Sequence, residues 1–378
     1  MREYGSGRQN QVMNDLYWVW LALKDEIKPR EIVELTSHFR DIKELYKKSD
    51  RKDFENFSEA TVNALMDKSL DDANKVIAKI QNMGGYILTL DDDNYPSLLR
   101  NIYDPPIVLY LLGQRLDWDN LLTVTIVGSR KYNSYGRTVT SEIAGSLAGS
   151  GAVVVSGMAL GIDSIANRAA LDMGAKTVAV LGSGLDVIYP PSNTNLYWDI
   201  VKNGVVMTEY PPGTRPLAQN FPRRNRIMAG LSYGVLVTQA PEKSGALITA
   251  SCALESGRDV FAVPANITMY ESVGTNRLLT AGAKAVIDAS DILSEYGHIT
   301  LTDEKNDKKT AKRPEDVDIT GLSEVQVKII YQLSGTPRLI DEISRSTGIQ
   351  SSVIGSELVM LELLDKVEKT DNNSYRLK

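Results

Sequence analysis

Apolar residues recur at helical spacing in the first part of the chain. Between about residue 11 and residue 85 they follow one face of successive helices, as Leu16, Val19 and Leu23 illustrate. The pattern predicts an N-terminal helical domain over residues 11–85.

From residue 86 to residue 298 the pattern changes to short β-branched runs that alternate with amphipathic stretches. Six runs are predicted strands: Thr123–Val127, Ala152–Ser156, Lys176–Leu181, Val205–Thr208, Gly234–Thr238 and Asp259–Val263. Nearly continuous apolar strands separated by helices indicate a parallel sheet with both faces covered. Because crossovers between parallel strands are right-handed, the predicted fold class is α/β, an extended Rossmann-like, doubly wound, mostly parallel sheet.

The chain then becomes polar before a core pattern returns. Residues 299–318 are charged and almost without large apolar side chains, which is typical of a linker. In residues 319–378, three helical segments (323–333, 338–347 and 351–365) precede the segment Val367–Leu377, with a predicted hairpin turn at Asp371-Asn372-Asn373. Three helices and a hairpin predict a winged helix. Because residues 319–378 carry seven basic and eight acidic side chains, we expect this module to dock to a protein rather than to DNA.

Composition excludes several classes of protein. No stretch among the 378 residues approaches the 18 consecutive apolar residues of a membrane-spanning helix, and the first residues lack the apolar core of a secretory signal. The single cysteine, Cys252, cannot form an internal disulfide, so we expect a cytoplasmic protein. His38 and His298 lie far apart, which leaves little from which to build a Ser-His-Asp triad or a metal site. With a net charge of −6, a nucleic-acid-binding protein would have to concentrate its positive charge locally.

The first candidate site follows the first central strand, at Gly128-Ser129-Arg130-Lys131. No carboxylate occurs between Asp119 and Glu142. Small residues let backbone N–H groups approach an anion, and the following helix adds a favourable N-terminal dipole. The alternative is a tight strand–helix turn with a solvated arginine.

The second candidate is the arginine cluster around residue 221. The window from Tyr210 to Pro241 contains four arginines and no acid. Arginine binds phosphate with two hydrogen bonds, and a phenylalanine can stack on a base. The predicted binding residues of this loop are Arg215, Phe221, Arg223, Arg224, Asn225 and Arg226. The alternative is a surface loop whose arginines pair with remote acids.

Other small, polar turns follow the remaining strands. Gly157, Gly184 and the pair Lys243-Ser244 stand in such turns, and together these would form a long, shallow anion-binding floor at one edge of the sheet. Asp163 is predicted to be a helix N-cap rather than a general base. The chain contains neither a Walker A sequence nor a G-x-G-x-x-G motif, and no acidic cluster indicates a two-metal nuclease.

Taken in order, these segments resemble a known family. The runs IVGSR, VVVSGMALGID, TVAVLGSGLDVIYPPSN, FPRRNRIMAGLS and SGALITASCALESGRDVFAVP, within roughly residues 90–295, are similar to the DNA processing protein A (DprA/Smf) family. The flanking pieces also resemble the family, which has an N-terminal helical domain of SAM or helix-hairpin-helix type and a C-terminal winged helix. By motif position, the family's DNA pocket corresponds to Gly128-Ser129-Arg130, Phe221 and Arg224-Asn225-Arg226.

The resemblance implies a function in natural transformation. It implies a homodimeric, single-stranded DNA-binding recombination mediator that protects incoming strands and helps to load the RecA recombinase. It implies no enzymatic activity, no cofactor and no metal, so no catalytic residue is predicted.

Several residues depart from the family pattern. Pro191 and Ala218 stand where many members have lysine, which predicts a lower affinity for DNA. Asn167 replaces a frequent histidine and Gln239 a frequent glutamate. Two alternatives stay open: a nucleotide-binding hydrolase on a related sheet, and a protein-interaction scaffold. Against the hydrolase, no Glu or His stands out as an acid or a base.

Overall fold

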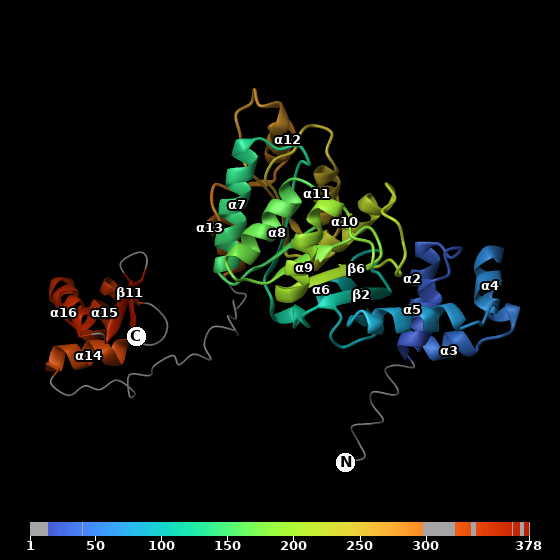
Figure 1. Cartoon of the computed structure of the whole chain (residues 1–378), viewed down its shortest axis with the longest axis horizontal. Helices are drawn as coiled ribbons and strands as arrows, with labels where there is room; N and C mark the ends of the chain where they lie inside the picture. The colour runs from blue at the N-terminus through green and yellow to red at the C-terminus, as the bar shows by residue number, and fades with distance from the viewer. Residues whose placement is uncertain are drawn as a thin grey trace, which may run out of the picture. The chain divides into compact units, whose positions relative to one another are not determined.

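The computed structural model describes residues 14–39, 41–297, 322–333, 338–364, 366–370 and 374–377. These residues belong to two compact units, Met1–Thr302 and Asp303–Lys378 (Figure 1). The division falls inside the predicted linker 299–318, which lies outside the described residues. Within the described parts, no helix combines the length and the apolar composition needed to cross a membrane.

A nine-stranded sheet organises the first unit. In spatial order it contains β1 (Tyr86–Thr89), β2 (Val108–Gly113), β6 (Val205–Thr208), β5 (Thr177–Val180), β4 (Val153–Ser156), β3 (Thr123–Val127), β7 (Gly234–Val237), β8 (Asp259–Ala262) and β9 (Lys284–Ala285). β2 pairs antiparallel with β1 and β6, and the other neighbouring strands are parallel. The predicted doubly wound, mostly parallel sheet is confirmed, and each of the six predicted strands is present within one residue at either end.

Three strands of this sheet were not predicted from the sequence. β1 and β2 form an antiparallel extension at one edge, and β9 has only two residues. β2 is a continuous buried run, which periodicity alone cannot distinguish from a buried helix.

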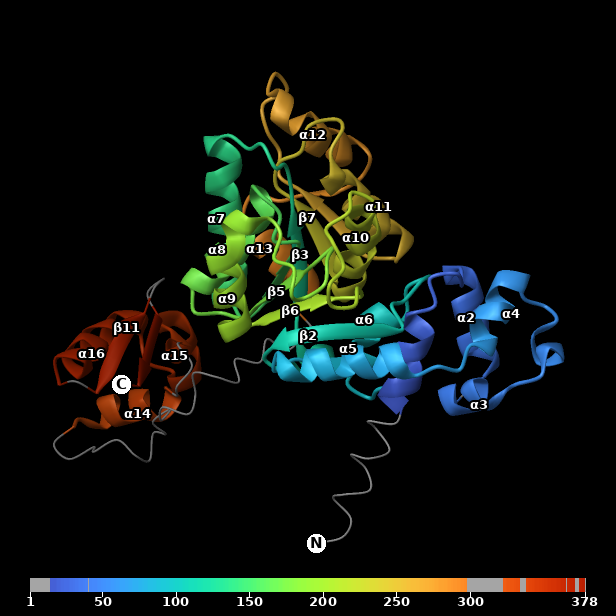
Figure 2. The same cartoon turned by 45° about the vertical axis from the view of Figure 1, so that its right-hand side comes forward.

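Helices cover both faces of the sheet (Figure 2). One side carries α7 (Ser134–Gly149), α8 (Ile162–Asp172) and α9 (Thr194–Asn203), and the other carries α10 (Asn220–Leu231) and α11 (Gly245–Glu255). α12 (Val273–Thr280) and α13 (Ser290–Leu293) follow the last strands. Central strand residues have no exposed surface, for example Val154, Val178 and Val235, because helices pack against both faces.

The N-terminal segment is helical, as predicted. It contains a helix over residues 14–22, α2 (Pro29–His38), α3 (Ile42–Lys47), α4 (Glu59–Met66) and α5 (Asp71–Asn82). Trp20 and Phe54 of this segment belong to the same apolar cluster as Tyr110 of β2 and Val206 of β6. The helices therefore share a core with the antiparallel edge of the sheet, and the domain boundary at residue 85 stays a prediction.

The second unit has its own core. It contains α14 (Glu324–Gln332), α15 (Ile340–Thr347) and α16 (Ser351–Leu363), with a three-stranded antiparallel sheet in the order β10 (Arg338–Leu339), β12 (Ser374–Leu377), β11 (Val367–Thr370). Buried Ile329, Ile343 and Leu358 bring the three helices together. The winged helix is confirmed, but the helical segment predicted from residue 338 begins only at Ile340, because Arg338 and Leu339 pair with β12 as a strand. The predicted turn at 371–373 lies outside the described residues.

Candidate nucleic-acid interface

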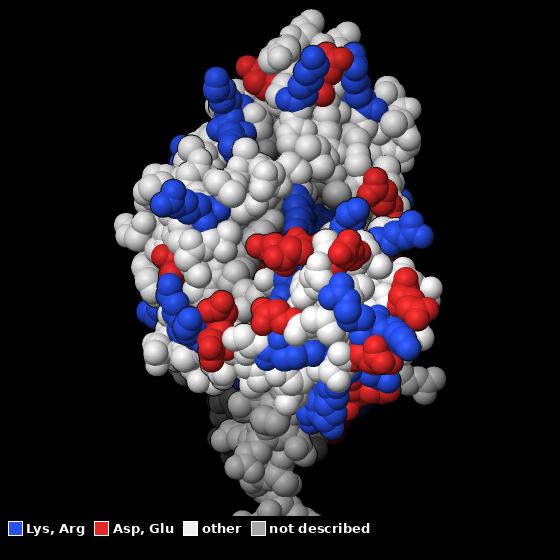
Figure 3. Space-filling model, turned by 90° about the vertical axis from the view of Figure 1, so that its right-hand side faces the viewer, with Lys and Arg blue, Asp and Glu red and all other residues white. Residues whose placement is uncertain are grey.

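A cleft of about 880 Å³ opens at the carboxyl ends of the central strands. It brings together the loop after β3, the start of α8, the first turns of α10 and the start of α11. Nine predicted site residues line it: Gly128, Ser129, Arg130, Lys131, Phe221, Arg224, Asn225, Lys243 and Ser244. Figure 3 shows Lys and Arg beside Asp and Glu over much of one face, with Lys or Arg atoms inside a central hollow.

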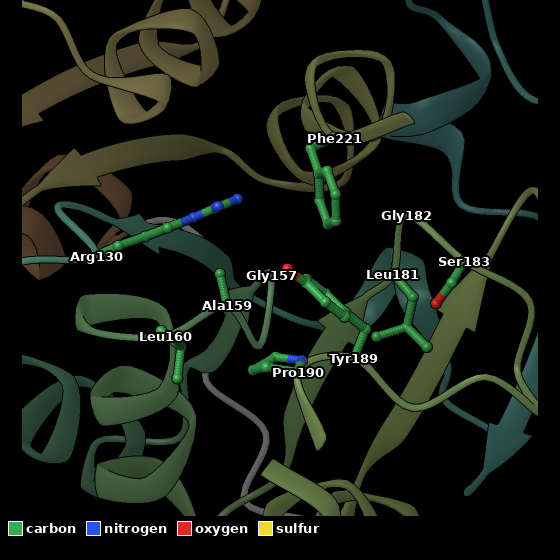
Figure 4. A pocket seen from close by; sticks show the side chains of 10 residues that line it. All are labelled: Arg130, Gly157, Ala159, Leu160, Leu181, Gly182, Ser183, Tyr189, Pro190 and Phe221. Carbon is green, nitrogen blue, oxygen red and sulfur yellow. The ribbon is translucent and has the colours of Figure 1, made fainter. Parts of the chain in front are cut away.

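An inner pocket adjoins this cleft and combines a cation with aromatic rings. It is lined by Arg130, Gly157, Tyr189 and Phe221, among others, and in Figure 4 the side chains of Arg130, Tyr189 and Phe221 point into the same space. The guanidinium carbon of Arg130 lies 5.4 Å from the centroid of the Phe221 ring, and the Tyr189 and Phe221 ring centroids are 5.7 Å apart. A cation above an aromatic face is an arrangement that suits a phosphate next to a stacked base.

The loop after β3 is shaped by close packing. A Cβ atom at Gly128 would lie 2.6 Å from Cγ1 of Ile162 and 2.8 Å from the carbonyl oxygen of Gln239, so only glycine lets α8 and the end of β7 come this close. The N–H group of Ser129 donates to that same Gln239 oxygen at 2.7 Å. This N–H is therefore engaged within the protein, and the exposed side chains of Arg130 and Lys131 are what the loop offers to a ligand.

The floor of the site contains a buried arginine. Arg224 is 3% exposed, donates from Nη1 to the carbonyl oxygen of Val180, and lies so close above Gly157 that a Cβ there would overlap its guanidinium group. Burial lowers the pKa of Arg224 to about 10, so the group stays positively charged at neutral pH. Its Nε has no hydrogen-bond partner among the described residues.

Asp163 accompanies Arg224 and differs from its prediction. Gly161, with φ of +89°, occupies the N-cap position of α8, while Asp163 lies inside the first turn and is 7% exposed. Burial raises the pKa of Asp163, although Arg224, Arg130 and backbone N–H groups of Ala159 and Gly157 oppose the shift. The N-cap prediction was wrong because the chain enters α8 two residues earlier.

The predicted arginine loop is a helix. Residues Phe221–Arg226 form the first turns of α10, with Pro222 inside the first turn, where its missing N–H costs nothing. Arg224 and Asn225 line the cleft, whereas Arg226 turns away from it. Nη2 of Arg226 lies 2.6 Å from Glu209 Oε2, and its Nε lies 3.2 Å from Asp104 Oδ2. Nε of Arg223 lies 3.6 Å from Glu209 Oε1, so the pairing with remote acids that the sequence left open is found for Arg223 and Arg226. DNA binding by Arg224 and Asn225 stays a prediction.

Two further predicted residues lie outside the cleft. The N–H group of Gly184 is buried and donates to the carbonyl oxygen of Thr214 at 3.0 Å. Arg215 is exposed on the loop before α10, although its neighbour Pro216 lines the cleft. Ala218 also lines the cleft, so the lysine expected there from the family resemblance is replaced inside the site.

Sequence reasoning missed two aromatic residues of the site. Tyr189 lines both the cleft and the inner pocket, and Tyr270 lines the cleft. The Tyr189-Pro190 pair after β5 was a usable signal, because it follows a strand at the same sheet edge. Tyr270 stands outside the arginine-rich windows, and nothing in its sequence surroundings singled it out.

Together, a doubly wound sheet and a cationic, aromatic cleft at the carboxyl ends of its strands place the chain among Rossmann-like α/β proteins. The chain belongs to the DNA recombination-mediator protein A family, whose model matches residues 86–297. A second model, the DprA winged helix domain, matches residues 313–373.

Relatives cover most of the chain. Protein Smf of Synechocystis sp. is 36% identical over 324 residues, which are 78% of this chain and 81% of that protein. DNA processing protein DprA of Streptococcus pneumoniae is 45% identical over 205 residues, which are 54% of this chain and 72% of that protein.

Two solved structures of DprA proteins are also similar to this chain. The X-ray structure of DprA from Streptococcus pneumoniae has a TM-score of 0.66 at 34% identity and covers 74% of this chain and 97% of that chain. A structure of DNA processing protein A from Helicobacter pylori, described for its single-stranded DNA binding mode, has a TM-score of 0.52 at 33% identity, over 57% of this chain and 96% of that chain.

Proposed function

We propose that this protein is a single-stranded DNA-binding recombination mediator that works as a cytoplasmic homodimer and catalyses no reaction. The observation that carries the proposal is the placement of Arg130 over the Phe221 ring, beside Tyr189, in a cleft at the carboxyl edge of the sheet. Membership of the family and the single-stranded DNA binding described for the Helicobacter pylori relative support it.

Each part of the cleft has a distinct role in this proposal. The exposed side chains of Arg130 and Lys131 attract phosphates, and the buried charge of Arg224 keeps the floor positive. Phe221 stacks on a base, which requires that base to be unpaired. The cleft therefore favours single strands over duplex, with little sequence preference, because contacts to phosphate carry no base information.

The test is a titration of a labelled oligo-dT and of a blunt duplex at two salt concentrations. The single strand should bind more tightly at both, and Phe221→Ala should weaken that binding by about 1–3 kcal/mol. Phe221→Tyr, which keeps the aromatic face, is the matched control. Equal affinity for duplex and single strand at physiological salt would contradict the proposal.

The downstream roles need separate assays. Protection of incoming strands predicts that the protein slows nuclease digestion of bound oligonucleotide, and RecA loading predicts faster strand exchange on covered DNA. The Phe221→Ala variant should need a higher protein concentration than the wild type in both assays, because both begin with strand binding.

A nucleotide-binding hydrolase is the second candidate, and Asp163 is the observation that favours it. This carboxyl group lines the cleft and has a raised pKa, as a general base would. Incubation with nucleotides should release neither base nor phosphate. Turnover that Asp163→Asn abolishes while single-strand binding survives would establish the hydrolase instead.

A further inference from the structure

A second exposed aromatic residue lines the cleft beyond the inner pocket. Tyr270 lies in the short 3-10 helix Tyr270–Ser272 and is 70% exposed. It lines the cleft together with Lys243 and Glu271, but it does not line the inner pocket around Phe221. The two aromatic residues therefore lie in different parts of one cleft.

The segment that carries Tyr270 is held in place by its neighbours. The hydroxyl group of Tyr135 donates to the carbonyl oxygen of Pro264 at 2.6 Å, and Nδ2 of Asn276 donates to that of Ala265 at 3.0 Å. At its other end, the N–H group of Gly274 donates to the carbonyl oxygen of Ala240 at 2.8 Å. The ring of Tyr270 is thus presented to solvent on an anchored segment. Contacts of neighbouring residues, rather than packing of the exposed ring itself, hold the segment in place.

Charge does not explain what this end of the cleft recognises. Lys243 and Glu271 both line it and carry opposite charges, and neighbouring Glu242 forms an ion pair with Arg277 at 2.5 Å. Attraction for phosphate is consequently weaker here than beside Arg130. The exposed ring face of Tyr270 is the feature that remains, and an aromatic face binds an unpaired base of any identity.

We propose that Tyr270 is a second base-stacking platform, so that the cleft holds a strand long enough to reach from Phe221 to Tyr270. A mononucleotide or a very short strand then occupies the Phe221 end alone. This inference rests on the proposed single-strand binding and adds to it a minimum length and a second contact.

The test measures affinity against strand length with the full chain. Fluorescently labelled oligo-dT of increasing length, from a dinucleotide upwards, is titrated against the wild type, Tyr270→Ala, Tyr270→Phe and Phe221→Ala. Tyr103→Ala is the matched control, because Tyr103 is 84% exposed and does not line the cleft. Melting temperature and molecular mass in solution are recorded for every variant.

Tyr270→Ala should bind the shortest strands like the wild type and longer strands roughly 5- to 100-fold more weakly. Tyr270→Phe and Tyr103→Ala should match the wild type at all lengths, whereas Phe221→Ala should lose affinity at every length. Equal affinity of Tyr270→Ala and wild type for long strands overturns the inference, as does a changed molecular mass, which would assign Tyr270 to a protein contact. If the wild type binds no single strand at any length, the proposed function fails first.

Discussion

Exposure separates the arginines of the cleft into two roles. Arg130 is exposed beside the Phe221 ring, while Arg224 is buried against Gly157 with its charge retained. An exposed guanidinium can exchange counterions for a phosphate, so it controls how affinity depends on salt. A buried guanidinium group, such as that of Arg224, forms part of the floor of the cleft, and neighbouring residues such as Gly157 must leave room for it.

Arg130→Ala should weaken single-strand binding without unfolding the protein. Loss of one phosphate contact should reduce the salt slope, the dependence of log affinity on log salt, by roughly 0.7. Titrations at several salt concentrations measure this. Arg137→Ala is the control, because Arg137 is also exposed but lies on α7 outside the cleft, and its slope should not change.

Gly157→Ala should damage both stability and binding. The new methyl group would overlap the Arg224 guanidinium, which must shift at a cost of roughly 1–3 kcal/mol in unfolding free energy. Urea denaturation measures the cost. Gly145→Ala in α7 is the matched control substitution, because a Cβ at residue 145 would meet only Met173 Cγ, at 3.7 Å. This variant should have an unchanged or higher free energy of unfolding. Equal stability of the two variants would show that Arg224 moves freely.

At the scale of elements, charged side chains of two helices, α10 and the helix over residues 14–22, lie close to acidic residues at the ends of neighbouring strands. The side chains of Arg226 and Glu209 are 14% and 8% exposed, so their ion pair fastens the back of α10 to the end of β6 while Phe221 and Arg224 face the cleft. The helix over residues 14–22 places Asp15 near Asp91 and Asp92, in the loop after β1.

Arg226→Ala should destabilise the protein by about 3–5 kcal/mol, because it leaves Glu209 buried without its closest partner. The salt slope of DNA binding should stay at the wild-type value, since Arg226 does not line the cleft. Arg223→Ala is the comparison on the same helix: its side chain is 49% exposed, so about 0–1 kcal/mol is expected. A reduced salt slope in Arg226→Ala would place this side chain on the DNA.

Asp15 should make stability depend on pH. Burial, together with Asp92 and Asp91, raises the pKa of Asp15 from 3.8 to about 7 in the folded chain. The folded state binds the proton of Asp15 more tightly than the unfolded state does. The protonated carboxyl group therefore adds its full contribution to the free energy of unfolding below pH 3.8, and this contribution is lost as the pH rises through about 7.

Urea denaturation at pH 5 and pH 8 should therefore show a smaller pH dependence in Asp15→Asn than in the wild type. Asp25→Asn changes an exposed carboxylate just after the same helix and should keep the wild-type pH dependence. An unchanged dependence in Asp15→Asn would mean that this carboxyl group is well solvated.

For the whole molecule, the separation into two units predicts separable functions. The winged helix has its own core around Ile329, Ile343 and Leu358, and its charge is close to balanced. The cleft is built entirely from residues of the first unit.

A chain that ends at Thr302 should therefore fold and bind single strands with nearly unchanged affinity and salt slope. Titration beside the full chain, with molecular mass measured for both, tests this. A large loss of affinity in a truncated protein of unchanged mass would show that the winged helix contacts DNA.

The sequence alone determined the central strands β3–β8, the winged helix and the edge of the sheet at which the cleft lies. These features depend on short-range patterns: strands buried on both faces are continuously apolar, and small or basic residues follow them. Gly128, Arg130 and Phe221 could be selected for the same reason, since the ends of parallel strands meet at one edge.

Only the tertiary structure decided which basic residues face the cleft and which aromatic residues join them. Arg224 and Arg226 look equivalent in sequence, but two residues of helix turn a side chain by about 200°, so one enters the floor and the other pairs with Glu209. Tyr189 and Tyr270 come to the same cleft from loops after β5 and β8. Their meeting depends on strand order and helix rotation, which are set by packing across the whole sheet rather than by neighbours in the chain.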